Sequence, residues 1–234
     1  MSLPFFYINQ IDKEATSFIL NEETSKHVVQ VLRMKVGDQL QLTDGVGNLI
    51  TASIVNDHKK KCIVNRLHSQ YFSPSAHKKI IAISLIKNAS RFEWFLEKAT
   101  EIGTTEIFPL ICARTEKQHF RFERMQGILI SAMLQSKQCW LPKLHEPILL
   151  NKLCKDVVAT NKYIAHCEDD QLKETPTFMK SSDVSIILIG PEGDFTTEEI
   201  NLSKENQYLP ITLGETRLRT ETAGVVAATL LNIT

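Results

Sequence analysis

The chain has 234 residues, of which 43% are hydrophobic, so it can form one large domain or two smaller ones with well-filled cores. Its 27 basic and 27 acidic side chains balance, which excludes a strong global field that would attract nucleic acid, so any RNA binding must depend on local patches. The five cysteines are odd in number and lack C-x-x-C spacing, as expected for reduced thiols in a cytosolic protein. Histidine and cysteine show no metal-ligand spacing, so no metal is predicted.

The sequence also lacks the segments that direct a protein to or through a membrane. Residues 1–10 carry neither the charged start nor the long apolar stretch of a secretory signal peptide. No apolar run approaches the roughly 20 residues that span a bilayer. We therefore expect a cytoplasmic protein without a membrane partner.

Residues 1–72 are predicted to form a small, mainly β domain. Short runs of alternating polar and apolar residues, with turn signals such as Asp44-Gly45, favour a small barrel with strands at 5–8, 39–43, 49–55 and 62–64. Residues 24–34 are predicted as a short helix whose inward-facing residues are Val28, Val29, Val31 and Leu32. The basic run at 58–61 is interpreted either as a solvated hairpin tip or as a local RNA contact.

A breaker cluster, Ser73-Pro74-Ser75, marks a linker near residues 71–77 and is followed by a segment of a different kind. Apolar strands now alternate with helices, which argues for a mostly parallel sheet. The helix predicted at 90–102 has an amphipathic stripe formed by Phe92, Phe95, Leu96 and Ala99. Strands are also predicted at 80–86, 106–110 and 163–167, and helices at 121–138 and 148–158.

The last quarter of the chain holds two glycine-centred loops, each between an apolar strand and a helix. In the first, the wholly apolar run 186–189 is typical of a strand covered on both faces. Gly190 and Gly193 then permit tight turns and the close approach of a ligand. The following helix has a predicted capping box and hydrophobic staple, formed by Thr196 with Glu199 and by Phe195 with Ile200.

The second loop repeats this plan with a strand at 209–213, Gly214, and a helix from about Thr220 to the end of the chain. Glu221 lies in the first turn, where a carboxylate suits the helix dipole. The helix has a small-residue face suited to very close packing, formed by Ala223, Gly224, Ala227 and Ala228. Either loop alone is weak evidence for a ligand site, and the dinucleotide and P-loop patterns are both absent.

Taken together, the segments 188–193, 213–214 and 218–223 closely resemble the signature of the ribosomal small-subunit methyltransferase E family. These are SPOUT-class enzymes with a trefoil-knotted α/β domain. The resemblance implies a PUA-like, RNA-binding β-barrel at residues 1–72 and a SPOUT methyltransferase domain at residues 73–234. It also implies transfer of a methyl group from S-adenosylmethionine to N3 of a uridine in the 16S rRNA of the 30S subunit, by a homodimer formed through the knotted domain.

The resemblance further implies roles for individual residues. Arg219 is expected to bind the uracil oxygen or an adjacent phosphate, and Glu221 to remove the N3 proton or to orient Arg219. The alternatives are a structural ion pair of Arg219 with Glu221 or Glu192, and a purely helix-stabilising role for Glu221. The residues expected to hold S-adenosylmethionine are His166, Leu188, Ile189, Gly190, Glu192, Gly193, Leu213, Gly214, Leu218, Thr222 and Ala223.

RNA contacts are implied for three further residues, and the chain departs from the family pattern at three others. His27 and Arg33 match an H-x-x-x-V-L-R pattern, and Arg114 matches an arginine that follows the next strand. A surface ion pair is the alternative role for Arg33. The departures are Leu134 and Gln138, where the family has Glu and Arg, and Asp194, where many members have a third glycine.

The sequence is compatible with three different functions. The first is the N3-uridine rRNA methyltransferase, the second a SPOUT enzyme acting on another RNA such as tRNA, and the third a non-catalytic RNA-binding protein with a vestigial pocket. The barrel-then-knot order favours the first over the second. The intact glycines, together with Arg219 and Glu221, favour an enzyme over the third.

Overall fold

The computed structural model describes residues 3–116, 119–168 and 183–233. The chain separates into two compact units, Met1–Pro74 with Met133–Leu141, and Ser75–Ala132 with Pro142–Thr234. The sequence alone did not indicate that residues 133–141 return to the first unit. Within the described segments, no helix is both long enough and apolar enough to cross a membrane.

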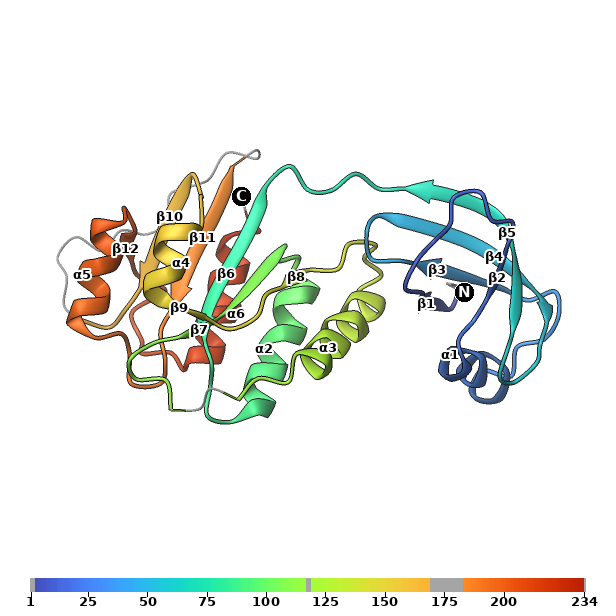
Figure 1. The fold of residues 1–234 in the computed structure, drawn as a ribbon, viewed down its shortest axis with the longest axis horizontal. Coiled ribbons are helices and arrows are strands. Elements are labelled where there is room, and N and C mark those ends of the chain that lie inside the picture. The colour runs from blue at the N-terminus through green and yellow to red at the C-terminus, as the bar shows by residue number, and fades with distance from the viewer. Residues whose placement is uncertain (1–2, 117–118, 169–182, 234) are drawn as a thin grey trace. The chain divides into compact units, whose positions relative to one another are not determined.

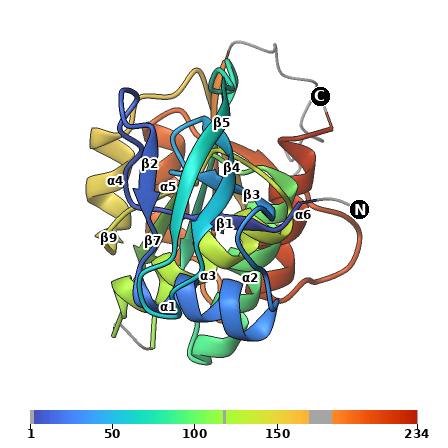
Figure 2. The ribbon, with the colours of Figure 1, turned by 90° about the vertical axis from the view of Figure 1, so that its right-hand side faces the viewer.

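The first unit is built on a curled five-stranded sheet with the order β1-β3-β4-β5-β2 (Figure 2). Its neighbouring strands are antiparallel, except for β1 and β3, which run parallel. Alternate residues of the sheet, such as Leu40, Leu42 and Ile50, are buried in one apolar core, as the predicted period of two requires. The strand bounds are β1 Phe5–Tyr7, β2 Ser17–Ile19, β3 Gln39–Thr43, β4 Asn48–Asn56 and β5 Ile63–Tyr71.

The helix of the first unit differs from the prediction. The α-helix α1 covers Glu22–Lys26 and continues as a π-helical turn, η1, over His27–Val31. Val28 is fully buried, but Val31 is 69% exposed and Leu32 43% exposed, so the prediction that both face inward is wrong. The physical reason is the wider π turn, closed by Leu32 N donating to His27 O at 2.9 Å, which rotates the following residues out of register with a 3.6-residue period.

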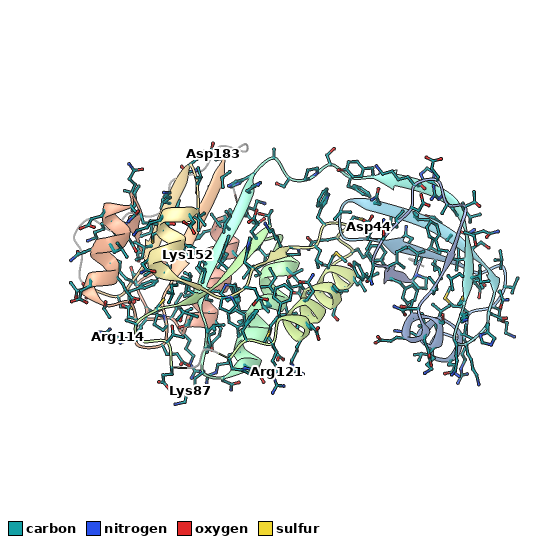
Figure 3. The ribbon with its side chains drawn as sticks, viewed as in Figure 1. Asp44, Lys87, Arg114, Arg121, Lys152 and Asp183 are labelled. Atoms are coloured by element: carbon teal, nitrogen blue, oxygen red, sulfur yellow. The ribbon has the colours of Figure 1, made fainter. Side chains whose placement is uncertain are left out.

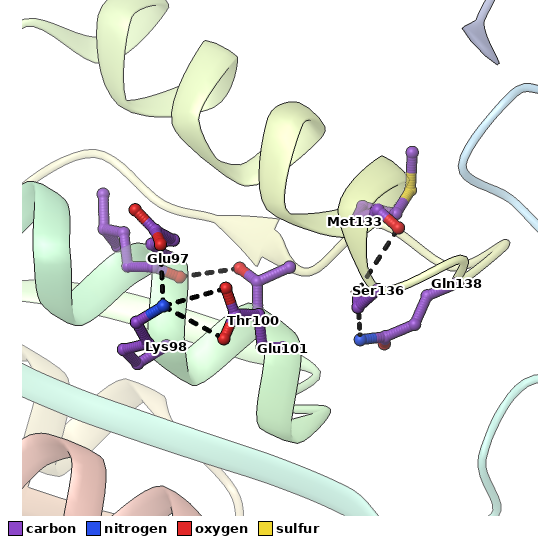
Figure 4. Close-up of polar contacts among 8 residues, drawn as sticks. Glu97, Lys98, Thr100, Glu101, Met133, Ser136 and Gln138 are labelled. Carbon is purple, nitrogen blue, oxygen red and sulfur yellow. Dashed lines mark hydrogen bonds and ion pairs between the residues drawn. The ribbon is translucent and has the colours of Figure 1, made fainter. Parts of the chain in front are cut away.

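Residues 133–141 are held in the first unit by hydrogen bonds to its backbone carbonyl groups. Trp140 Nε1 donates to the carbonyl oxygen of Phe72 at 2.9 Å, and Leu141 N donates to Gly45 O at 2.8 Å. Gln138 makes a local hydrogen bond, because its Nε2 donates to Ser136 Oγ at 2.9 Å (Figure 4). The amide that departs from the family pattern therefore contributes to the turn after helix α3, which ends at Gln135.

The second unit contains a sheet with the order β12-β10-β11-β6-β7-β8, and β9 also pairs with β7 (Figure 1). Every strand pair in it is parallel, which confirms the predicted parallel sheet. The strand bounds are β6 Lys78–Ser84, β7 Glu106–Ile111, β8 Lys143–Leu144, β9 Ile148–Leu149, β10 Asn161–Ala165, β11 Val184–Ile189 and β12 Leu209–Ile211.

Helices cover both faces of this sheet, which is why its central strands are apolar throughout. On one face, Leu188 belongs to a core that includes Leu153 of α4 and Ile200 of α5. On the other face, Ile83 lies against helices α2 and α6. The helix bounds are α2 Ala89–Ile102, α3 Phe122–Gln135, α4 Leu150–Asp156, α5 Thr197–Glu205 and α6 Thr220–Leu230.

Helix α6 packs very closely inside the second unit, as its small residues predict. A Cβ atom on Gly224 would lie 2.7 Å from Ile83 Cδ1 and 2.7 Å from the ring of Phe95, and Ala227 and Ala228 are fully buried. This face of α6 is therefore occupied by β6 and α2 of the same chain. Its small residues give no support to a contact between two copies of the protein.

Candidate cofactor and substrate site

A cavity of about 780 Å³ lies where three parallel strands of the second unit end. It is bounded by residues 165–167 after β10, by the loop that begins at Ile189 after β11, and by residues 211–220 after β12, together with Arg91 and Ala223. Ligands of open α/β sheets bind outside the carboxyl ends of the strands, and their pockets commonly measure about 300–1,000 Å³. Position and size therefore both suit a cofactor-sized ligand.

The predicted cofactor residues divide into two groups. Eight line the cavity: His166, Ile189, Gly190, Glu192, Leu213, Gly214, Leu218 and Ala223. Three do not. Leu188 is buried in the core on the α4 and α5 face, Gly193 lies against Arg114, and Thr222 lines a smaller cavity next to the first. Arg219 lines both cavities.

The loop after β11 has its shape fixed by Phe195. That side chain is buried and folds back over Gly190, where a Cβ atom would lie 3.0 Å from the aromatic ring. Only glycine therefore fits at position 190 without displacing the ring. The predicted capping box is confirmed, because Thr196 Oγ1 accepts from Glu199 N while Glu199 Oε2 accepts from Thr196 N.

Asp194 joins this loop to the end of β10. Its Oδ2 accepts from the backbone N–H of Cys167 at 2.7 Å, and its Oδ1 accepts from Phe195 N at 2.8 Å. The residue has φ +65°, a left-handed conformation that Asp tolerates better than most side chains and that glycine adopts freely. The structure thus explains the glycine usual at this position, and shows a carboxylate clamp between two walls of the cavity that the sequence did not reveal.

Arg114 supports the same loop from the segment after β7 (Figure 3). Its Nη1 donates to Gly193 O at 2.7 Å and to Phe195 O at 3.4 Å. A neighbouring backbone N–H, that of Ala113, donates to Glu199 Oε1 at 2.8 Å. The guanidinium expected to contact RNA is therefore engaged with the backbone of the cavity loop.

The loop after β12 is held by a compact turn and leaves space at its glycine. Thr212 Oγ1 accepts from Gly214 N at 3.3 Å and lies 3.0 Å from Gly214 O. Gly214 has φ +132°, and apart from its two chain neighbours no described residue has an atom within 4 Å of the position that a Cβ would take. The backbone here is open to a ligand, and the arginines that follow, Arg217 and Arg219, are exposed.

The carboxylates at the cavity pair with an arginine that was not predicted. Arg91 Nη1 lies 3.7 Å from Glu192 Oε1, and Arg91 Nε lies 3.6 Å from Glu221 Oε1. Among the described residues Arg219 forms no ion pair, so its proposed structural pairing with Glu192 or Glu221 is wrong. The sequence contains one weak indication that Arg91 has a special role. It lies in the first turn of α2, where the helix dipole disfavours a cation, so a nearby carboxylate partner would be expected.

Glu221 is nearly enclosed by the protein. Its side chain is 9% exposed, and its Oε2 atom has no hydrogen-bond partner among the described residues. A buried carboxylate oxygen without a donor is costly, because it has lost water without gaining a hydrogen bond. Such an atom is a candidate to receive a proton from a bound substrate.

The two RNA-contact candidates of the first unit lie at its surface. His27 is exposed and meets the ring of Phe6 edge-on, with the centroids 5.7 Å apart. Arg33 follows the π turn and has φ +56°. Within the described segments Arg33 has no ion-pair partner, so the alternative role considered for it is not observed there.

Comparison with known proteins gives consistent matches over nearly the whole chain. The model for the RNA methyltransferase domain family matches residues 73–232, and the model for the RNA methyltransferase PUA domain matches residues 20–65. A Rickettsia conorii protein named ribosomal RNA small subunit methyltransferase E is 30% identical over 228 residues, a match that covers 94% of this chain and 91% of that protein.

Solved structures resemble the chain equally well. A protein from Porphyromonas gingivalis, described as a probable rRNA-methyltransferase, has a TM-score of 0.88 at 35% identity, covering 97% of this chain and 95% of that one. A ribosomal RNA small subunit methyltransferase E from Neisseria gonorrhoeae, bound to S-adenosyl methionine, has a TM-score of 0.86 at 27% identity, with the same coverage of 97% and 95%.

Proposed function

Since this chain belongs to the ribosomal RNA small subunit methyltransferase E family, we propose that it transfers a methyl group from S-adenosylmethionine to N3 of a uridine in 16S rRNA. The predicted family and the SPOUT-class α/β fold with a PUA-like N-terminal unit are confirmed. The observation that carries the proposal is the cavity at the carboxyl ends of β10, β11 and β12, with Arg219 at its rim and the Glu221 carboxylate behind it.

The cavity fits S-adenosylmethionine by its volume and by the open backbone of its walls. Gly214 leaves space beside the chain, and Gly190 is fixed by the ring of Phe195, so the two loops form a preshaped cradle. When bound, S-adenosylmethionine supplies a methyl group on a positively charged sulfur. The loops after β11 and β12 are proposed to hold its adenosine and methionine parts, with His166 contributing from the end of β10.

Methylation at N3 requires that uracil lose its N3 proton, and Glu221 is the proposed acceptor. Its free Oε2 takes the proton, and Arg91, 3.6 Å from Oε1, orients the carboxylate. The uracil anion carries its charge on the ring oxygens, which the guanidinium of Arg219 stabilises. Holding the nitrogen in line with the methyl group supplies up to about 7–11 kcal/mol of the barrier reduction.

Partners and location follow from the same family. We propose that the protein acts in the cytoplasm on the 30S subunit or its rRNA, that the first unit contacts RNA through His27 and Arg33, and that two copies form a dimer. The exposure of His27 and Arg33 supports the RNA contacts. Because Gly224, Ala227 and Ala228 are buried within one chain, the proposed dimer uses a surface other than these three residues of α6. Arg114 is assigned to holding the cavity loop.

The role of Arg219 is tested with two arginine variants. Arg219→Ala is expected to bind S-adenosylmethionine like the wild type in titration calorimetry and to lose methylation of 30S subunits by 100-fold or more, about 2.7 kcal/mol. Arg121→Ala, which removes an exposed arginine that lines neither of the two cavities, is the control and is expected to remain active. If Arg219→Ala methylates 30S subunits as fast as the wild type, Arg219 has no role in catalysis.

Two alternatives are tested in the same assay. A SPOUT enzyme for another RNA would methylate tRNA and leave 30S subunits and 16S rRNA unmodified. A non-catalytic RNA-binding protein would bind RNA without any methyl transfer. The buried Glu221 carboxylate argues against the second alternative, since an inactive pocket gains nothing from a buried oxygen that lacks a donor.

A further inference from the structure

A second, smaller cavity of about 300 Å³ adjoins the first. The residues that line it come from the N-terminal parts of two helices, α2 and α6: Ser90, Arg91, Trp94, Arg219, Glu221 and Thr222. Arg91 and Arg219 also line the larger cavity, so the two spaces meet at these side chains. A substrate group placed in the smaller cavity would therefore face a cofactor placed in the larger one.

One wall of the smaller cavity is an aromatic side chain that the core does not require. Trp94 is 43% exposed, whereas Phe92 and Phe95 on the same helix are buried. The inward stripe of α2 consists of Phe92, Phe95, Leu96 and Ala99, so Trp94 lies outside it. Proteins that recognise unpaired bases commonly stack them on such exposed aromatic rings.

The charged groups of the smaller cavity complement one particular base. Arg91 and Arg219 are donors, and Glu221 offers the Oε2 atom that has no hydrogen-bond partner among the described residues. The pairing edge of uracil presents an acceptor, a donor and an acceptor, namely O4, N3–H and O2. Cytosine has an acceptor at N3 and a donor at C4, so its N3 lone pair would face the carboxylate and its amino group an arginine.

From these observations we infer that the smaller cavity is the subsite for the flipped-out target uracil, with Trp94 as its stacking surface. The donor–acceptor–donor set of Arg91, Glu221 and Arg219 reads the pairing edge and selects uridine over cytidine. This inference rests on the proposed methyltransferase function and assigns to it a base-binding site and a specificity determinant. Trp94 acts by direct contact with the base.

The kinetic test uses Trp94→Ala and the conservative Trp94→Phe. Trp94→Ala is expected to lower kcat/KM for 30S subunits by about 5- to 150-fold, the effect of losing one base–aromatic stack. Its affinity for S-adenosylmethionine is expected to be unchanged, and Trp94→Phe should recover most of the loss. A wild-type kcat/KM for Trp94→Ala would overturn the inference, and so would an equal loss of S-adenosylmethionine affinity, which would assign Trp94 to the cofactor site.

A binding test does not depend on turnover. The chain has two tryptophans, so Trp140→Phe leaves Trp94 as the only one. With S-adenosylhomocysteine bound, a single-stranded oligouridine is expected to quench this fluorescence more strongly than an oligocytidine of equal length. Equal quenching, or none, would contradict the inference. If the wild type binds S-adenosylmethionine but methylates no RNA, the proposed function fails, and quenching with oligouridine still decides the base subsite separately.

Discussion

At the scale of single residues, Asp194 shows how a departure from the family pattern is accommodated. Its carboxylate accepts hydrogen bonds from Cys167 N and Phe195 N and so joins the end of β10 to the loop after β11. The sequence identified the position as unusual, but the contact depends on β10 and β11 being neighbours in the sheet. A local pattern contains no information about a partner 27 residues away. The same reason hid the role of Arg91, whose carboxylate partners lie far along the chain, Glu192 in the loop after β11 and Glu221 in the first turn of α6.

Replacing Asp194 is expected to loosen the cofactor cavity. Asp194→Ala removes both hydrogen bonds and leaves a Cβ residue at φ +65°, so S-adenosylmethionine affinity should fall about tenfold or more, since hydrogen bonds to charged groups contribute about 1.5–3 kcal/mol. Asp194→Asn tolerates the left-handed conformation but keeps only one acceptor oxygen, so it can retain one of the two hydrogen bonds and should bind S-adenosylmethionine with an affinity between those of Asp194→Ala and the wild type. Titration calorimetry compares the two, and equal affinity of Asp194→Ala and wild type would show that the clamp does not shape the cavity.

At the scale of elements, local signals predicted the regular parts well. Periodicity located five strands of the parallel sheet but missed the two-residue strands β8 and β9, and the first two residues of the helix predicted at 148–158 form β9. The capping box fixed the start of α5 at Thr197. The prediction from periodicity failed at the π turn of His27–Val31. The π turn adds one residue to a helical turn and so changes the period, and no residue type in the sequence indicates that this happens. The close approach of α6 to β6 was indicated by small residues, but its partners, Ile83 and Phe95, required the structure.

The packing of α6 predicts opposite effects for the same substitution at two helical glycines. Gly224→Ala would place a Cβ 2.7 Å from Ile83 and Phe95, and the resulting overpacking should lower the free energy of unfolding by about 1–3 kcal/mol despite the better helix propensity of Ala. The new Cβ of Gly127→Ala, on the exposed face of α3, has no contact of this kind within 4 Å. This variant should raise the free energy of unfolding by up to about 1 kcal/mol, because Ala has the better helix propensity. Urea unfolding of both variants measures this, and a Gly224→Ala variant as stable as the wild type would contradict the close packing.

At the scale of the whole molecule, the α/β class and the likeness to one enzyme family could be predicted from the sequence, because two loop motifs carry the family pattern. The return of Met133–Leu141 to the first unit could not, since it depends on a backbone hydrogen bond from Leu141 to Gly45 and on a hydrogen bond from the Trp140 side chain to the carbonyl oxygen of Phe72. Buried titratable groups also affect the molecule as a whole, because a pKa that differs between the folded and unfolded states makes the free energy of unfolding depend on pH.

The lowered pKa of the buried His77 leads to a prediction of how the free energy of unfolding changes with pH. Burial lowers its pKa below the usual 6.5, an effect strengthened by Lys79 and opposed by Asp183, and burial likewise lowers the pKa of His145. The unfolded chain therefore binds more protons just below pH 6.5, so this contribution is full above pH 6.5 and is lost as pH falls through the lower folded pKa. In urea unfolding, His77→Gln should flatten the slope of stability against pH in this window, and an unchanged slope would exclude His77 as a source.

The account is tested most directly by identifying the methylated nucleoside. Purified protein is incubated with S-adenosylmethionine and 30S subunits that lack the modification, the 16S rRNA is digested to nucleosides, and the products are separated by liquid chromatography and identified by mass spectrometry. The account predicts 3-methyluridine in 16S rRNA, formed by the wild type and by Arg121→Ala and absent with Arg219→Ala. A methyl group on another nucleoside, methylation of tRNA alone, or no product from protein that binds S-adenosylmethionine would contradict it.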